Sequence, residues 1–273
     1  MYLTYFGLDE YPFSITPDTQ FAYNATSHEE ALNTLLLAIH SGEGFVKITG
    51  EVGAGKTLLC RKLLSLLGED RLAAYIPNPQ LEPRALLAEV ATELGAEDGK
   101  DAAMLVRAIN RRLLEIAAAG KTAVLCIDEA QTIPALTLQT LRLLSNLETE
   151  KRKLIQIVLF GQPELDELLA EKAARQVLQR ITFHYRMPGL KRHELAIYLQ
   201  HRLRIAGYRG PSLFSRAARW ALYRHSNGMP RLVNVLAHKA LIAAFGEGAE
   251  RVGYQHVRRA SQDTESAYRR GWF

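Results

Sequence analysis

The hydrophobic pattern predicts strands and helices in alternation from residue 45 to residue 187. Short runs that are apolar at consecutive positions are typical of strands buried on both faces of a parallel sheet, whereas apolar residues three and four apart indicate amphipathic helices. The expected strands lie at residues 45–49, 72–77, 122–127, 154–160 and 181–187. The expected helices lie at residues 58–67, 83–95, 101–119, 135–147 and 163–170. This order predicts an α/β fold with a parallel sheet sandwiched by helices.

The pattern changes after Pro188 and Gly189. Three amphipathic helical stretches follow, within residues 190–207, 213–226 and 231–245, with no strand pattern between them. We therefore expect two domains, an α/β domain over residues 1–187 and a small all-helical domain over residues 188–273.

Composition agrees with a soluble globular chain of this size: 273 residues are 48% hydrophobic and 23% charged. The two cysteines, Cys60 and Cys126, have neither metal-ligand nor disulfide spacing, and we expect both as buried free thiols. The sequence contains no signal-peptide pattern and no apolar run of the roughly 18 residues that a membrane helix needs. A cytoplasmic protein is expected.

Charge is divided unevenly along the chain. Residues 1–174 contain 16 Lys and Arg against 24 Asp and Glu, a net charge of −8, whereas residues 175–273 contain 18 against 5, a net charge of +13. A basic half of this kind meets an anion such as a nucleotide, nucleic acid or acidic surface, or it carries a solvated arginine-rich helical face. Net charge alone does not distinguish these readings.

The sharpest chemical signal is GEVGAGKT at residues 50–57, between an expected strand and an expected helix. It is a complete G-x-x-x-x-G-K-[ST] phosphate-binding loop in the strand–loop–helix context that this motif requires. Its glycines let successive N–H groups turn toward one point, and the helix N-terminus adds a positive end. We expect ATP there, with Lys56 reaching the β- and γ-phosphates and the Thr57 hydroxyl coordinating Mg²⁺.

Two acids end the apolar strand at 122–127, namely Asp128 and Glu129. Buried strands do not end in paired carboxylates without a cation or solvent to accept the charge, and Mg²⁺ is the obvious cation beside a phosphate loop. Asp128 is expected to hold Mg²⁺, and Glu129 to act as general base toward the attacking water. An acidic turn that caps the next helix is the alternative.

Polar residues near the later strands add weaker signals. Gln162 follows the strand at 154–160 and could orient the water, although a turn that caps the next helix explains it equally well. Arginines flank the last strand and begin a lid helix, at Arg175, Arg180, Arg186 and Arg231. Taken alone, each of these arginines is more often a surface charge.

Together these features resemble an AAA+ ATPase, and a further set of motifs is similar to the general secretion pathway A family. The motifs are YFGL at 5–8, PF at 12–13, TPD at 16–18, TGEVG at 49–53, IDEAQ at 127–131, LLSNLET at 143–149 and GQPEL at 161–165. The resemblance runs from about residue 5 to about residue 260. It implies a P-loop AAA+ domain followed by a small helical lid.

The resemblance also assigns roles to individual residues. The Walker A motif corresponds to Gly50, Glu51, Val52, Gly53, Ala54, Gly55, Lys56, Thr57 and Leu58. Walker B falls on Asp128 and Glu129, and sensor 1 on Gln162. The arginine finger that reaches a neighbouring subunit falls on Arg180, with Arg175 in reserve, and sensor 2 falls on Arg231. Tyr23 matches the segment that closes over adenine; Ser27 and Glu30 read as helix capping.

The family includes ATPases of type II secretion and of MSHA-type pilus assembly. The resemblance therefore implies a Mg²⁺-dependent ATPase that forms a homo-oligomer and powers or regulates assembly of a cell-envelope machine. Longer members continue into a membrane helix and a periplasmic peptidoglycan-binding region. Because this chain ends at Phe273 with neither, we expect the short pilus-associated type or a cytosolic fragment, peripheral to the inner membrane through a membrane-embedded partner protein.

The alternative is a DNA-associated AAA+ switch of the transposition-helper or initiator type. The basic second half favours it, because neutralisation of phosphates by Lys and Arg is the main source of non-specific DNA affinity. The sequence shows neither a winged-helix reader after residue 250 nor an aromatic-basic stacking segment. Glu129 and the helical second domain disfavour a small-molecule kinase. The family motifs favour the secretion role.

Overall fold

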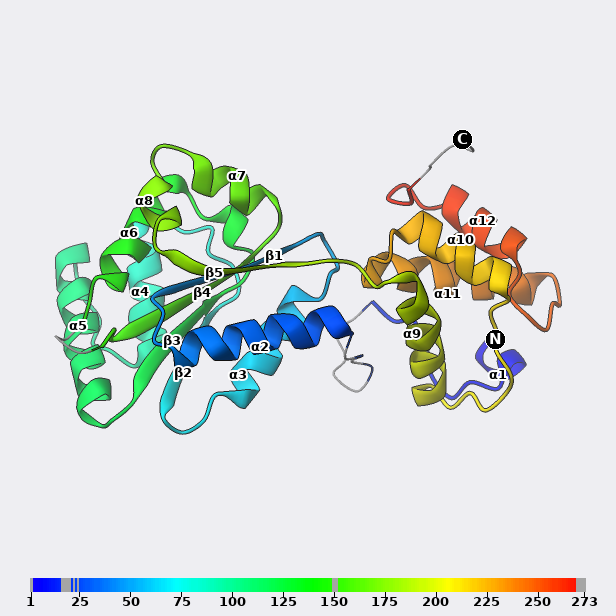
Figure 1. Cartoon of the computed structure of the whole chain (residues 1–273), viewed down its shortest axis with the longest axis horizontal. Coiled ribbons are helices and arrows are strands. Elements are labelled where there is room, and N and C mark those ends of the chain that lie inside the picture. Colours follow the sequence, from blue (N-terminus) through cyan, green and yellow to red (C-terminus); the bar gives the residue numbers. More distant parts are fainter. Residues whose placement is uncertain (1, 16–20, 22, 24, 149–151, 269–273) are drawn as a thin grey trace. The chain divides into compact units, whose positions relative to one another are not determined.

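The computed structural model describes residues 2–15, 21, 23, 25–148 and 152–268. Within them, five strands form one parallel sheet in the order β2-β3-β4-β1-β5 (Figure 1). The strands are β1 (Phe45–Gly50), β2 (Arg71–Ile76), β3 (Thr122–Ile127), β4 (Ile155–Gly161) and β5 (Ile181–Met187). All five expected strands are present, and the predicted parallel sheet is confirmed.

Helices cover both faces of this sheet, and Figure 1 shows α2 and α3 on one side and α6 to α8 on the other. Their bounds are α2 (Thr26–His40), α3 (Lys56–Leu66), α4 (Pro83–Leu94), α5 (Ala102–Ala118), η1 (Ala130–Thr132), α6 (Ala135–Ser145), α7 (Glu164–Ala170) and α8 (Arg175–Leu178). Side chains alternate across each strand. Leu125 of β3 and Ile157 of β4 therefore join the core under α4 to α6, while their neighbours Cys126 and Val158, also fully buried, face the other side. Cys60 and Cys126 are buried free thiols, as expected.

The chain divides into two compact units. One, which we call the α/β unit, contains His28–Glu51 and Leu59–Met187. The other, the helical unit, contains Met1–Ser27, Val52–Leu58 and Pro188–Phe273. The N-terminal segment and the central part of the phosphate loop thus group with the C-terminal helices, a difference from the expected division into residues 1–187 and 188–273.

The helical unit is built from α1 (Tyr2–Phe6), α9 (Arg192–Ile205), α10 (Arg216–Ser226), α11 (Pro230–Gly246) and α12 (Tyr254–Gln262). Arg202 of α9 holds the N-terminal segment in this unit, because its guanidinium group donates to the carbonyls of Pro12, at 2.5 Å, and Ser14, at 3.2 Å. The same group lies 4.8 Å from the centre of the Phe21 ring. The buried guanidinium group of Arg202 thus binds backbone oxygens that lie almost two hundred positions away in the sequence.

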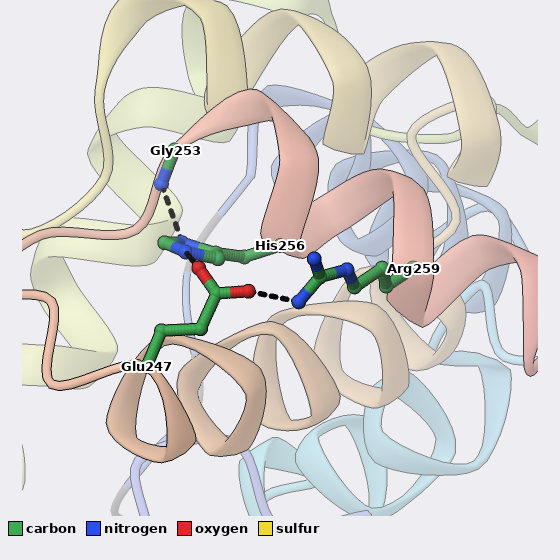
Figure 2. A network of polar contacts seen from close by, with 4 residues as sticks. All are labelled: Glu247, Gly253, His256 and Arg259. Atoms are coloured by element: carbon green, nitrogen blue, oxygen red, sulfur yellow. Dashed lines mark hydrogen bonds and ion pairs between the residues drawn. The ribbon is translucent and has the colours of Figure 1, made fainter.

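A polar network joins the last two helices (Figure 2). The backbone N–H of Gly253 donates to Nδ1 of His256 at 2.9 Å, and Nε2 of His256 lies 2.9 Å from Oε2 of Glu247. Because Nδ1 accepts, the ring proton sits on Nε2 and is donated to Glu247. Arg259 pairs with the other oxygen of the same carboxylate. His256 is 7% exposed, so the network closes the turn between α11 and α12 with a neutral imidazole.

This network predicts a loss of stability in mild acid. Burial lowers the pKa of His256 below its usual 6.5, so the unfolded chain takes up a proton at a higher pH than the folded chain does. The contribution of His256 is fully present above about pH 6.5 and falls as the pH drops from there toward the folded-state pKa. Urea unfolding at several pH values should show a shallower acid loss for His256→Gln than for the unaltered chain. The exposed His193 supplies the control, and an equal change in His193→Gln would contradict the assignment.

Candidate active site

The carboxyl ends of β1, β4 and β3 meet at one edge of the sheet, in that order. The phosphate loop leaves this edge after Gly50, Asp128 and Glu129 follow β3, and Gln162 follows β4. In open parallel sheets, ligands bind at the carboxyl ends of the strands. The topology thus gathers the predicted catalytic residues of the α/β unit at the edge where a ligand is expected.

Asp128 continues the sheet by one residue beyond β3. Its backbone N–H donates to the carbonyl of Ile76 at 2.9 Å, and its carboxylate accepts from the backbone N–H of Glu129 at 2.9 Å. The residue is only 2% exposed. Burial, and next the negative charge of Asp128, raise the pKa of the Tyr75 hydroxyl on the adjacent strand to about 12. This buried carboxylate is a fixed oxygen donor of the type that Mg²⁺ prefers.

Glu129 adopts a backbone conformation that is unusual for its residue type. Its φ of 51° and ψ of 36° lie in the left-handed region. Non-glycine residues held there are strained, and such strain gathers at functional sites. The Glu129 carboxylate accepts hydrogen bonds from the side-chain amides of Gln131, at 2.6 Å, and Gln162, at 3.2 Å. Backbone and side chain therefore both hold this acid in place.

Gln131 is a site residue to which the sequence pattern assigned no role. It lies on the short turn η1, and while its amide nitrogen donates to Glu129, its Oε1 accepts from the backbone N–H of Gln162 at 3.0 Å. One side chain therefore ties the end of β3 to the end of β4. Its position two residues after a strand-end acid was the available signal, but nothing in the sequence showed that the amide turns back toward that acid.

Gln131 holds the carboxylate of Glu129, the expected general base, so we predict that Gln131→Leu slows the expected ATP hydrolysis about tenfold while ATP affinity stays within about twofold. Steady-state turnover and nucleotide titration would separate the two quantities. Gln131→Asn tests positioning, since a shorter amide should restore part of the rate. The exposed Gln139 provides a matched control, Gln139→Leu. Equal losses of rate and affinity would contradict a positioning role for Gln131.

The phosphate loop has the backbone that its glycines allow. Between the end of β1 and the start of α3 at Lys56, Gly53 has a φ of 80° and Gly55 a φ of 96°. These values suit glycine and few other residues. Lys56 is 5% exposed and Thr57 is half-buried at the first turn of α3. Turned amides followed by a helix N-terminus form an anion-binding arrangement, so the loop fits a phosphate chain.

Within the helical unit, Arg231 lies against this loop. It is the second residue of α11, after Pro230, and its backbone N–H approaches the carbonyl of Gly53 at 3.4 Å. A Cβ atom added to Gly53 would lie only 2.3 Å from Cβ of Arg231, so a side chain at position 53 is excluded by space as well as by backbone conformation. The proposed sensor 2 arginine is therefore beside the proposed phosphate loop.

Arg180 lies at the amino end of β5, so it is at the end of the sheet opposite the carboxyl ends that carry Asp128 and Glu129. It directly precedes β5, and its guanidinium group donates to Oγ of Ser145, at the end of α6, at 3.3 Å. A strand of seven residues is about 20 Å long. Within one α/β unit, Arg180 is thus separated from Glu129 by about the full length of a strand.

The remaining predicted residues lie elsewhere. Arg175 is exposed on α8, and Arg186 is exposed near the carboxyl end of β5. Tyr23 contacts α9 through the rings of Tyr198 and His201, whose centroids are 5.7 and 5.6 Å away. The TPD segment at 16–18 and Thr149 of the LLSNLET motif lie outside the described residues.

The helix that follows Tyr23, α2, starts before Ser27, whereas an N-cap at Ser27 would place its first residue after Ser27. Because α2 begins at Thr26, Ser27 lies inside the helix. The carboxylate of Glu30 accepts from the Tyr185 hydroxyl at 2.6 Å. Glu30 thus joins α2 to β5 through this hydrogen bond.

Comparison with known proteins defines the class. Residues 39–169 match the AAA domain family, and this range includes the phosphate loop, Asp128, Glu129 and Gln162. The fold is similar to that of the ORC2 protein of Aeropyrum pernix in its ADPNP–ADP complexes, with a TM-score of 0.66 and 19% identity, covering 93% of this chain and 72% of that one. It is also similar to the RuvB Holliday junction branch migration motor of Thermotoga maritima, with a TM-score of 0.55 and 16% identity over 90% of this chain and 73% of that one. Residues 39–169 of this chain are thus similar to the AAA domain, and the fold agrees with that similarity.

Within this class, the sequence is similar to General secretion pathway protein A of Aeromonas hydrophila. The two are 42% identical over 265 residues, which cover 96% of this chain and 48% of that protein. This confirms the resemblance to the general secretion pathway A family that the sequence motifs indicated. The chain spans about half the length of this relative. Among the described residues, no helix is both long and apolar enough to cross a membrane.

Proposed function

We propose that this AAA ATPase binds ATP with Mg²⁺ through the residues that the motifs identified. The loop from Gly50 to Leu58 takes the phosphates, and Lys56 neutralises the β- and γ-phosphates. Thr57 and Asp128 supply oxygen ligands to Mg²⁺, which needs only one or two protein oxygens when phosphates and water complete its coordination. When bound, Mg²⁺ neutralises the charge that develops on the phosphates.

Hydrolysis in this proposal depends on the amide-held acid at the sheet edge. Glu129 accepts a proton from the attacking water, and Gln162 orients the same water through its side-chain amide. Gln131 keeps the Glu129 carboxylate at one place, through the 2.6 Å bond. This arrangement of an acid and two amides, at the edge from which the phosphate loop leaves, is the observation that carries the proposal.

The first test is Lys56→Ala. Removing the ammonium group takes away the charge that opposes the phosphates, so ATP binding is expected to be lost at concentrations that saturate the unaltered chain. Isothermal titration calorimetry with ATP and Mg²⁺ would measure this directly. The exposed Lys172, outside the phosphate loop, gives a control, Lys172→Ala, which should bind normally. Undiminished binding by Lys56→Ala would exclude the proposed loop as the nucleotide site.

We further propose that the ATPase forms a homo-oligomer and serves assembly of a cell-envelope machine, in type II secretion or MSHA-type pilus biogenesis. The similarity to General secretion pathway protein A, across 96% of this chain, supports this role. A membrane-embedded partner protein would bring the ATPase to the inner membrane from the cytoplasmic side. Oligomerisation would place Arg180 of one subunit at the nucleotide of the next.

A pull-down from the native cell envelope under ATP-trapping conditions tests this role. The expected result is recovery of a membrane protein with Glu129→Gln, which should retain ATP, and not with Lys56→Ala. The rival role is that of a DNA-associated switch, which the net charge of +13 in residues 175–273 favours. ATP-dependent DNA retention that falls steeply with salt, without a membrane partner, would support the rival role instead.

A further inference from the structure

A groove in the helical unit lies apart from every residue assigned above. It is formed by one face of α9 and by the segment that joins α9 to α10, and its volume is about 420 Å³. Ala196, Ile197, Gln200 and Arg204 line it at the helical intervals that place side chains on one face of α9. Its size is in the range of about 300–1,000 Å³ that is usual for binding pockets. We call it the arginine groove.

The floor of the arginine groove is apolar. Leu199, Leu203, Leu213 and Phe214 line it and are at most 4% exposed. Ile197 stands at its side and is 53% exposed, which leaves a large aliphatic side chain open to a partner. A partner that buried Ile197 would gain free energy from the apolar area removed from water.

Three arginines line the same groove, namely Arg204, Arg209 and Arg219, and no acidic residue lines it. Within the described part of the chain, none of their guanidinium groups has a hydrogen-bond or ion-pair partner. Three acids of the helical unit have partners outside the groove: Glu194 accepts from the backbone of Lys191, Glu247 pairs with Arg259, and Asp263 pairs with Lys239. The carboxylate of Asp9 lies against Gly207, beside the groove, and forms no ion pair with the three arginines. Among the described residues, the three groove arginines therefore have no carboxylate bound directly to them.

We propose that the arginine groove binds an acidic segment of a partner protein whose carboxylates alternate with apolar side chains. Guanidinium groups bind carboxylates through paired N–H donors, which accounts for the three arginines. An apolar anchor on the segment would fill the floor beside Ile197. The inference stands on the helical unit alone and does not depend on the role in secretion.

The aromatic residues of the groove favour a peptide over nucleic acid. Bases of single strands stack on exposed aromatic faces. Phe214 is 1% exposed and packs edge-on against Phe13, with ring centroids 5.8 Å apart. The Tyr208 hydroxyl donates to the carbonyl of Pro211 at 2.8 Å, and its ring lies against Gly210. The Phe214 ring is therefore closed to stacking and the Tyr208 hydroxyl is engaged within the chain, whereas the apolar floor suits an apolar side chain of a peptide.

A displayed library of random 12-residue peptides, selected on the full chain, tests the proposal. We expect the enriched peptides to combine Asp or Glu with Leu, Ile or Phe. The most enriched peptide, labelled with a fluorophore, is then titrated against variants by anisotropy. The dissociation constant should rise about tenfold or more for Arg204→Glu combined with Arg209→Glu, and about tenfold for Ile197→Ser.

Matched controls lie outside the groove. Ile242 on α11 is 47% exposed, and Arg258 on α12 is exposed, so Ile242→Ser and Arg258→Glu alter the same residue types elsewhere. Both should bind the peptide normally, and the groove variants should keep the basal ATP turnover. Turnover is read separately, so a failure of the proposed ATPase chemistry would leave the peptide result standing.

Three outcomes would overturn the proposal. One is a selection that enriches no peptide, or only neutral and basic ones. Another is equal weakening by Arg258→Glu and by the groove charges, which would show a non-specific electrostatic attraction. The third is duplex DNA competing with the peptide while Ile197→Ser has no effect, which would show that the arginines serve phosphates.

Discussion

Glu129→Gln is expected to bind ATP as tightly as the unaltered chain and to hydrolyse it about 10²–10⁴-fold more slowly. Glutamine has almost the size of glutamate, and its carbonyl oxygen can still accept from the amides of Gln131 and Gln162. The loop that takes the phosphates is not altered. What disappears is the carboxylate proposed to accept a proton from water, so the change should fall on turnover and spare affinity.

Single-turnover hydrolysis and nucleotide titration measure the two quantities separately. Glu164→Gln makes the same chemical change at an exposed acid in the first turn of α7, just beyond Gln162, and should leave turnover unchanged. If Glu129→Gln hydrolysed ATP at the normal rate, another group would have to be the base. The strained backbone of Glu129 would then require a different explanation.

The strands and the phosphate loop were readable from the sequence because their signals are local. Strands such as Thr122–Ile127 are buried on both faces, so consecutive apolar residues mark them without ambiguity. The loop at residues 50–57 is identified by its glycines, which allow unusual backbone angles, and by the lysine and threonine that follow them. Gly53 and Gly55 do have positive φ angles. Parallel pairing then gathers Asp128 and Gln162 at one edge.

The packing of the last helix was not predicted, because its buried face is partly polar. Helix α12, Tyr254–Gln262, buries His256 and Ser261 beside Val257 and Ala260. A hydrophobic pattern does not count a histidine as a core residue. Here the histidine is buried because Gly253 and Glu247 satisfy both of its ring nitrogens, and that partnership is visible only in three dimensions.

Long-range polar contacts explain the other differences. The N-terminal segment groups with the helical unit through long-range contacts such as those of Arg202, which the sequence shows only as one basic residue among many. The role of Gln131 likewise depends on the direction in which its side chain turns. Local patterns predict elements, whereas these residues act through partners that are distant in the sequence or on an adjacent strand.

Arg180→Ala is expected to reduce hydrolysis about 10³–10⁵-fold under conditions in which the chain assembles, with little loss of ATP affinity. Arg180 lies at the amino ends of the parallel strands, whereas Glu129 lies at their carboxyl ends. Arg180 is therefore not placed to serve the active site of its own α/β unit. An arginine supplied by a neighbouring subunit stabilises the charge of the transition state and contributes nothing in an isolated chain. Turnover of the unaltered chain should therefore rise with its concentration, and that of Arg180→Ala should not.

Two experiments separate this role from a structural one. Ser145→Ala removes the partner that holds Arg180 in the single chain, and it should leave turnover intact because the guanidinium group is still present.

Mixing two inactive variants is the sharper test. An Arg180→Ala subunit retains Glu129, and a Glu129→Gln subunit retains Arg180, so two inactive variants should recover part of the activity when they assemble together. If the mixture stays inactive while each variant still assembles, either Arg180 acts within its own chain or another arginine is the finger. Mixing Arg175→Ala, in place of Arg180→Ala, with Glu129→Gln would distinguish these two explanations.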